Sequence, residues 1–242
     1  QKGRVDACFS NPARSCAPSA ASMDLIERAA LPIVARHVTA AAHLFALTAA
    51  ILLLVWVLRF AGGLGLHSAN KDRVFNVHPV VMFMGFIFVA GEAVMAFKLV
   101  RAPKRVQKLV HMALQLVALA FGIFGVRVAF KYHKESQIPD MTSLHSWLGM
   151  VTICLFGVQW LFGFLLFWFP GAPRPTRELV APLHAYAGLA LFLLTICTAE
   201  TGLVEKSAEP GMESRLVNFT GLFILLFGIA VSIAAARPRA TL

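Results

Sequence analysis

The chain alternates between long stretches without any charged side chain and short segments that hold most of its charges. Six stretches lack Asp, Glu, Lys and Arg altogether, and they cover residues 37–58, 74–91, 109–126, 141–173, 179–199 and 216–236. They contain 22, 18, 18, 33, 21 and 21 residues, whereas a helix needs roughly 20 apolar residues to cross the hydrocarbon core of a bilayer. The pattern therefore predicts an all-α integral membrane protein with six transmembrane helices.

Composition supports this interpretation because the chain is too apolar for a water-soluble domain. Hydrophobic residues make up 58% of the 242 positions and charged residues only 14%, against about a quarter charged in soluble domains. The formal net charge is nevertheless +10. With no contiguous soluble domain left to present a basic face, this surplus does not indicate nucleic-acid binding, and we expect no nucleic-acid partner.

We expect a transmembrane domain over residues 33–236, with a tail before it over residues 1–32 and a short cytosolic tail after it over residues 237–242. The beginning of the chain lacks the apolar core of a signal peptide, and Met23 is a candidate start of the native protein. We therefore expect residues 1–32 to be disordered or derived from an expression vector.

The positive charges are unequally divided between the two ends of the predicted helices. If successive helices alternate in direction, 14 of the 22 Lys and Arg lie on the side that holds both termini, and 8 lie on the other side. Five of the 14 lie in the short segment between the second and third helices, namely Lys98, Arg101, Lys104, Arg105 and Lys108. Because Lys and Arg are enriched in cytosolic loops, we expect both termini to face the cytosol.

Four of the eight histidines lie near the starts of the second to fifth predicted helices, and ionisable groups inside a membrane are costly and usually functional. His78 and His145 enter from the non-cytosolic side, whereas His111 and His184 enter from the cytosolic side. The second and fourth helices, and the third and fifth, are diagonal neighbours in a four-helix bundle, so each His can face one partner across the core. Two facing imidazoles suit the two axial positions of a haem iron.

This arrangement predicts two haems, one near each membrane surface and roughly 20 Å apart along the membrane normal. A proton relay or helix-packing role is the alternative, and structural zinc is disfavoured because no Cys or carboxylate lies at ligand spacing. His37 and His43 on the first helix compete for the cytosolic site, but six residues apart they do not share a helix face well. Glu92 and Glu200 also lie within spans, where we expect hydrogen bonds inside the bundle, with proton transfer as the alternative.

The sequence around the four histidines resembles the transmembrane cytochrome b561 family. The segments that carry the resemblance are FNVHP around His78, KLVH at His111, SLHSWLG at His145 and PLHAYAG at His184. NKDRVFNVHP at 70–79 is especially similar to plant members, and AVMAFKLVR at 93–101 and TGLVEK at 201–206 are similar to further family segments. The resemblance covers about residues 33–236, with the motifs in family order and at family spacing.

The resemblance implies a protein with two b-type haems that carries electrons from cytosolic ascorbate to monodehydroascorbate or ferric chelates across the membrane. The family's ligand pairs correspond to His78 with His145 and to His111 with His184, the pairing that the helix topology predicts. The resemblance also implies a homodimer, and the plant-like motifs favour the vacuolar membrane first and the plasma membrane second. The alternatives are a haem-bearing membrane anchor for a partner enzyme and a His-relay transporter.

Ascorbate is an anion, so its docking surface needs cations beside the edge of a haem. Lys104 and Lys108 lie shortly before His111, and Arg177 lies seven residues before His184. By resemblance these three cations occupy family positions for ascorbate or haem propionate. The alternative is a positive loop that only sets the topology.

The resemblance assigns further contacts at both ends of the bundle. Lys98 and Arg101 are additional candidates for the propionates, whereas Phe167 replaces a Tyr found in several members and lacks its hydroxyl. On the non-cytosolic side, Tyr132 and His133 fall near the outer substrate, where His133 would accept a proton or bind a metal chelate. The residues assigned to the outer haem are Asp140, Met141, Thr142, Ser143 and Glu205. Thr142 replaces a frequent aromatic residue, so we expect different packing there.

Overall fold

The computed structural model describes residues 20–207 and 211–236, and neither range contains a β-strand. Its elements are α2 (Ala20–Val55), η1 (Trp56–Phe60), α3 (Lys71–Phe75), α4 (Val77–Val81), η2 (Met82–Ile87), α5 (Phe88–Leu99), α6 (Lys104–Ser136), α7 (Leu144–Phe167), α8 (Arg174–Lys206) and α9 (Met212–Ala236), where η1 and η2 are π-helical. Six spans are long and apolar enough to cross a membrane: Arg36–Phe60, Lys71–Leu99, Lys104–Ser136, Leu144–Phe167, Arg174–Lys206 and Met212–Ala236. The prediction of an all-α protein with six transmembrane helices is confirmed.

The predicted tails lie largely outside the described residues, since residues 1–19 and 237–242 are not among them. α2 begins at Ala20, which is inside the range 1–32 that we predicted as a tail. The boundary at residue 33 therefore stays a prediction. Residues Val38–Arg237 form one compact unit, and the packing described below concerns this unit.

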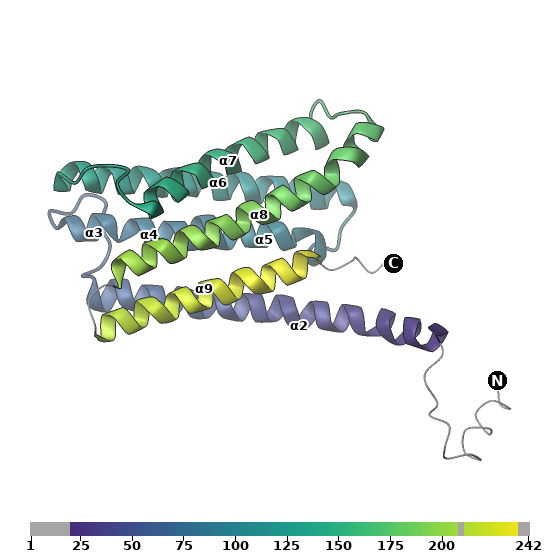
Figure 1. Cartoon of the computed structure of the whole chain (residues 1–242), viewed down its shortest axis with the longest axis horizontal. Helices are drawn as coiled ribbons and strands as arrows, with labels where there is room; N and C mark the ends of the chain where they lie inside the picture. The colour runs from purple at the N-terminus through teal and green to yellow at the C-terminus, as the bar shows by residue number, and fades with distance from the viewer. Residues whose placement is uncertain (1–19, 208–210, 237–242) are drawn as a thin grey trace, which may run out of the picture. The chain divides into compact units, whose positions relative to one another are not determined.

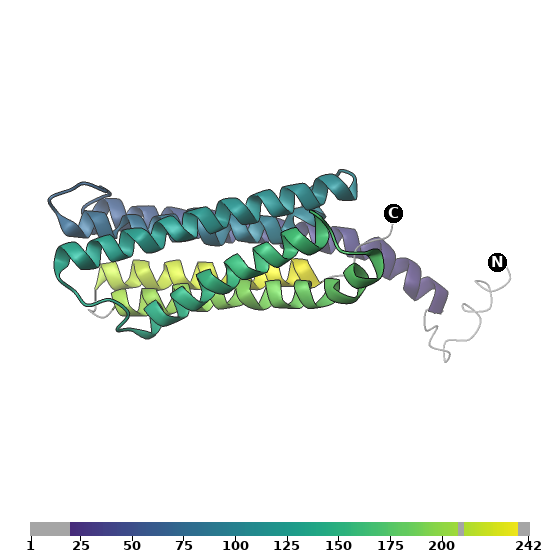
Figure 2. The same ribbon diagram turned by 90° about the horizontal axis from the view of Figure 1, so that it is seen from above.

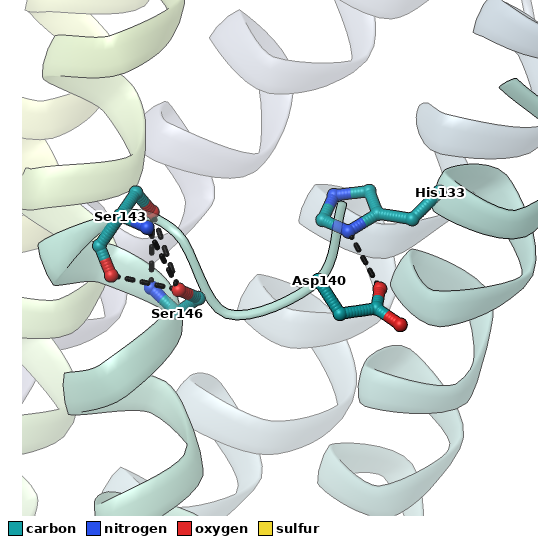
Figure 3. A network of polar contacts seen from close by, with 4 residues as sticks. All are labelled: His133, Asp140, Ser143 and Ser146. Atoms are coloured by element: carbon teal, nitrogen blue, oxygen red, sulfur yellow. Dashed lines mark hydrogen bonds and ion pairs between the residues drawn. The ribbon is translucent and has the colours of Figure 1, made fainter. Parts of the chain in front are cut away.

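Two helix starts that position the candidate site are capped by short polar side chains. The Asp72 amide donates to the side chain of Asn70 at the start of α3, over 2.9 Å. At the start of α7, Ser143 and Ser146 form a reciprocal capping box, drawn in Figure 3. Such caps satisfy amide groups that have no partner within the helix. They set where each helix begins, and in α7 they place His145 in the first turn.

The second span is not a uniform helix. α3 and α4 are separated at Asn76, which is 1% exposed and whose amide donates to the carbonyl oxygens of Ala61 (2.7 Å) and Gly63 (2.9 Å). Gly63 has a φ of +95°, a backbone conformation that favours glycine. Asn76 thereby holds the loop after η1 against the second span, two residues before His78.

Neighbouring spans pack side by side and run in alternating directions (Figures 1 and 2). α4 and η2 pack against α6, α6 against α7, α7 against α8, and α8 against η2, so the second to fifth spans surround a common interior. α9 packs against α8 and α5. Trp56 of η1 donates its indole N–H to Glu213 of α9 over 2.9 Å. The four spans that carry the candidate histidines thus form the predicted four-helix bundle.

Candidate functional site

The four predicted histidines come from four different helices of the bundle, α4, α7, α6 and α8. His145 is the second residue of α7, as predicted, whereas His78 is the second residue of α4 but the eighth of its span, which begins at Lys71. His111 and His184 lie two to three turns inside α6 and α8 rather than in the first turn. These two histidines lie deeper than predicted because their helices begin at Lys104 and Arg174, several residues before the charge-free stretches begin.

The histidines face one another in the predicted pairs. The ring centres of His78 and His145 lie 6.0 Å apart with the ring planes at 85°, and those of His111 and His184 lie 6.5 Å apart at 75°. A first-row metal ion binds an imidazole nitrogen at about 2 Å, so two imidazoles on opposite sides of one ion have ring centres about 6 Å apart. Both pairs therefore fit an iron held between two axial imidazoles.

Backbone carbonyl groups orient three of the four imidazoles. The Nδ1–H of His78 donates to Gly125 O (2.9 Å) and that of His111 to Ala93 O (2.8 Å). His145 donates in the same way to Thr198 O (2.8 Å). A carbonyl can only accept, so these contacts keep the proton on Nδ1 and leave Nε2 free to bind a metal.

His184 is held by a side chain instead. Its Nδ1 lies 3.1 Å from Gln159 Nε2, and the same amide nitrogen lies 2.7 Å from the His184 carbonyl oxygen. Because the carbonyl oxygen can only accept, this amide nitrogen is the donor, so the contact with Gln159 does not fix the proton on Nδ1 of His184 as the carbonyls do for the other three histidines. The ring also contacts Phe167 edge to face, with ring centres 5.2 Å apart.

Two glycines form the walls beside one imidazole of each pair. A Cβ at Gly202 of α8 would lie 2.7 Å from Cε1 of His145, and a Cβ at Gly163 of α7 would lie 2.9 Å from Cε1 of His184. Carbon atoms do not approach so closely, so any larger side chain would displace the ring. Sequence reasoning missed this role because a glycine beside a ligand has the same signature as a glycine between packed helices.

A cavity of ≈ 350 Å³ opens beside the His78 and His145 rings. Apolar side chains of the bundle interior, including Phe83 and Phe86, line its deeper part. Of the residues predicted around the outer haem and substrate, five line it: Tyr132, His133, Met141, Ser143 and Glu205. Within the described part of the chain, Asp140 and Thr142 are not among its lining residues. A largely apolar cavity between two imidazoles suits a planar macrocycle with a central metal.

Polar contacts at the mouth of this cavity involve residues that the sequence did and did not indicate. His133 Nδ1 lies 2.9 Å from Asp140 Oδ1 (Figure 3), so Asp140 orients the imidazole of His133. Phe75 and Lys206 were not predicted. The Phe75 ring contacts Tyr132, with ring centres 5.0 Å apart, and the Lys206 ammonium lies 5.1 Å from the centre of the same ring. Lys206 therefore adds a cation next to the predicted substrate residues.

The cationic residues predicted for the cytosolic side lie at helix ends on the side of the His111–His184 pair. Lys98 is in the last turn of α5, Arg101 follows it, and Lys104 begins α6. Lys108 is half-buried one turn before His111, and Arg177 lies in the first turn of α8. Among the described residues, the buried Nε of Arg177 has no hydrogen-bond partner. A buried N–H group without a partner is costly, which fits a site that receives an anion.

Comparison with known proteins agrees with this geometry. The sequence profile of eukaryotic cytochrome b561 matches residues 77–209, which include all four histidines. The chain is 44% identical over 217 residues to the probable ascorbate-specific transmembrane electron transporter 1 of Oryza sativa subsp. japonica, covering 86% of this chain and 93% of that protein. It is 42% identical over 215 residues to the transmembrane ascorbate ferrireductase 1 of Arabidopsis thaliana, covering 86% and 90%. The chain therefore belongs to the eukaryotic cytochrome b561 family.

Proposed function

We propose that this protein is an ascorbate-dependent transmembrane oxidoreductase, which moves electrons from cytosolic ascorbate to monodehydroascorbate or a ferric chelate on the opposite side. The observation that carries the proposal is the presence of two His pairs, each at the ring separation of 6.0 or 6.5 Å that suits an iron. The names of the relatives, which include ascorbate-specific electron transporters and ascorbate ferrireductases, support ascorbate as the donor.

Membership of the family implies b-type haem, and the proposal extends this to two haems in each chain. His78 and His145 would hold the iron near the non-cytosolic side, and His111 and His184 would hold the iron near the cytosolic side. When bound, each haem supplies an iron that gains and loses one electron. The protein orients the imidazoles through Nδ1 and excludes water with its apolar interior.

On the cytosolic side, Lys104, Lys108 and Arg177 form the proposed docking surface for the ascorbate anion. Their charges attract the anion, and their N–H groups donate to its oxygens or to haem propionates. Lys98 and Arg101 are proposed to bind propionates. The unpartnered Nε of Arg177 supports this assignment because a bound anion would satisfy it.

On the opposite side, the proposed acceptor site lies at the mouth of the 350 Å³ cavity. Tyr132 and His133 would contact the acceptor, and His133 would hold the proton that accompanies an electron. Lys206 adds a positive charge that favours an anionic acceptor. The proposed contacts to the outer haem are Met141, Ser143 and Glu205 in the cavity wall, with Asp140 and Thr142 beside them in the chain.

The proposal includes the placement of the protein in its membrane. Both termini face the cytosol, since the end of α5, the start of α6 and the loop between them carry five cations in residues 98–108. The protein is proposed to act as a homodimer, in the vacuolar membrane first and the plasma membrane second. Protease accessibility of tagged termini in sealed vesicles tests the orientation.

An optical titration of the purified protein tests the proposed function. Two haems in each chain, both reduced by ascorbate, support it. Protein that binds no haem contradicts it and favours a His-relay transporter. Haem that ascorbate cannot reduce also contradicts it, and then a membrane anchor for a partner enzyme becomes the better explanation.

Replacing Lys108 with Ala is expected to raise the ascorbate concentration for half-reduction by about tenfold, because charge-assisted hydrogen bonds contribute about 1.5–3 kcal/mol. Both haems stay bound, since Lys108 is not a ligand. Reduction is followed by absorbance against ascorbate concentration. Arg105→Ala is the matched control, because Arg105 is an exposed cation of the same helix. Equal titrations for the two variants would place the docking surface elsewhere.

A further inference from the structure

A pair of ionisable side chains lies inside the spans and takes no part in the proposed haem binding. His43 Nε2 on α2 lies 3.1 Å from Glu92 Oε1 on α5. His43 Nδ1 lies 2.7 Å from the Thr39 carbonyl oxygen, one turn earlier on α2. Because a carbonyl only accepts, Nδ1 carries a proton and Nε2 faces the carboxyl. The two atoms are within ion-pair distance, so a protonated His43 imidazole would pair with the Glu92 carboxylate. Within the described residues, Oε1 has no hydrogen-bond partner without that proton.

This pair lies at the depth of the cytosolic histidine ligands. His43 is the eighth residue of the span Arg36–Phe60, and Glu92 is eighth from the end of the span Lys71–Leu99. His111 is likewise the eighth residue of its own span. At 1.5 Å per residue, Glu92 and His111 lie about 10 Å inside the cytosolic ends of their helices, and His43 lies at the same level because it contacts Glu92.

The same turn of α5 connects the pair with a ligand. Glu92 precedes Ala93, whose carbonyl oxygen accepts the Nδ1–H of His111 over 2.8 Å. Ala93 is fully buried, whereas the Glu92 side chain is 21% exposed and that of His43 is 44% exposed. The pair is thus separated from the ligand by one residue of α5 and one hydrogen bond.

Of the charged and titratable groups described near this level, Glu92 is the carboxyl that contacts a histidine. The others are Arg36 and His37 on α2, Lys98 on α5, Lys108 and His111 on α6, and Arg174, Arg177, Glu178 and His184 on α8. α9 contributes none between residues 216 and 236. Glu178 is paired with Arg174 over 2.8 Å near the start of α8, whereas Glu92 faces a histidine, which can itself gain or lose a proton.

We propose that the His43–Glu92 pair is a proton site coupled to electron arrival at the cytosolic end of the bundle. The pair takes up one proton from the cytosol when the iron held by His111 and His184 gains one electron from ascorbate. The electron adds a negative charge in a region that solvates charge poorly, and the proton cancels it. When the electron passes to the outer site, the pair returns the proton to the cytosol, so no proton crosses the membrane. This inference rests on the proposed haem ligands.

Redox titration of the purified, haem-loaded protein between pH 6 and 8 tests the inference. When one electron is coupled to one proton, the midpoint potential falls by up to about 59 mV for each tenfold fall in proton concentration. We expect this slope for the cytosolic-side haem of the wild type. In Glu92→Gln the amide keeps the shape of the carboxyl and cannot take up a proton, so the slope flattens. His43→Gln is expected to weaken it as well.

Glu200→Gln is the matched control. Glu200 is also an acid within a span, but it is seventh from the end of the span Arg174–Lys206 and hence on the non-cytosolic side. The slope of the cytosolic-side haem should equal that of the wild type in this variant. A slope that flattens equally in Glu92→Gln and Glu200→Gln overturns the assignment to this pair.

A purely structural role of the pair predicts a different result. Glu92→Gln would then lower the unfolding temperature and leave the slope unchanged, which overturns the inference, as does a wild-type slope of zero. Infrared redox-difference spectra give a readout that does not depend on the variant folding. A carboxyl C=O band or an imidazolium band that appears on reduction supports the inference, and the absence of both overturns it. Failure of the proposed function is distinguishable, because the wild type would then lack haem or resist ascorbate.

Discussion

Replacing His111 with Ala is expected to remove the haem at the cytosolic end and to abolish reduction by ascorbate. An axial position would lose its imidazole, and the His184 ring alone would face a gap where a ring centre now lies 6.5 Å away. Methyl groups cannot bind iron, so the remaining single ligand would hold the haem weakly. His78 and His145 lie on other helices and should keep the second haem.

The measurement is the haem content of the purified variant together with its reduction by ascorbate and by dithionite. We expect haem content to fall from two to one for each chain. The remaining haem should respond to dithionite and no longer to ascorbate, because electrons from the cytosolic side would have lost their entry point. His67→Ala is the matched control, since His67 is an exposed loop histidine. Two haems in the His111→Ala protein would show that this histidine is not a ligand.

The spans and the pairing of the histidines were predictable because both depend on patterns along the chain. Charge-free stretches of 18 to 33 residues indicate membrane crossing whatever the tertiary packing. Alternating helix direction then sorts the histidines by side, and the observed pairs of ring centres agree with that sorting. The depth of His111 and His184 was less predictable, since charged residues at the ends of α6 and α8 continue the helices beyond the apolar stretches.

The support of the imidazoles could not be predicted from the sequence. Three of the four Nδ1 atoms contact backbone carbonyls, at Gly125, Ala93 and Thr198. Every residue carries a carbonyl, so nothing in the identity of these residues marks the contact. Which carbonyl points toward an imidazole depends on the packing and rotation of helices. The π-helical segment η2, whose residues have no marked signature, shifts these rotations in the second span.

The residues at the mouth of the outer cavity also could not all be predicted from the sequence. Tyr132 and His133 were assigned by resemblance, but Phe75 and Lys206 lie more than fifty residues away on either side in the chain. They join the site because α3 packs beside α6, and its Phe75 ring contacts both Tyr132 at the end of α6 and Lys206 at the end of α8. Contacts between the ends of different helices can be identified only from the tertiary structure.

Gly202→Ala is expected to remove most of the outer haem, nearly as completely as loss of the His145 imidazole would. The added Cβ would lie 2.7 Å from Cε1 and 2.9 Å from Nδ1 of that ring. The ring cannot move aside without losing either its hydrogen bond to Thr198 O or its alignment with the iron. The helix itself should not suffer, because Ala favours a helix by about 1 kcal/mol relative to Gly. Haem content and the optical spectrum of each haem are the measurements.

Gly157→Ala separates the steric effect from the general consequence of adding a methyl group within a span. A Cβ at Gly157 would have its nearest neighbours, the methyl groups of Leu119, at 3.9 Å, an ordinary contact. This variant should keep both haems. Retention of both haems in Gly202→Ala would show that the α7 and α8 backbones separate enough to admit the methyl group, and that the glycine is not needed for the ligand.

Gly163 occupies the corresponding position beside His184 at the other end of the bundle. A Cβ at Gly163 would lie 2.9 Å from Cε1 of His184, so Gly163→Ala should remove the cytosolic haem and spare the outer one. Each substitution is therefore expected to remove one haem only, and the two variants should differ in whether ascorbate reduces the remaining haem. The remaining haem of Gly163→Ala should no longer be reduced by ascorbate, whereas that of Gly202→Ala should still be reduced. A non-specific weakening of the bundle would instead lower both haems together in both variants.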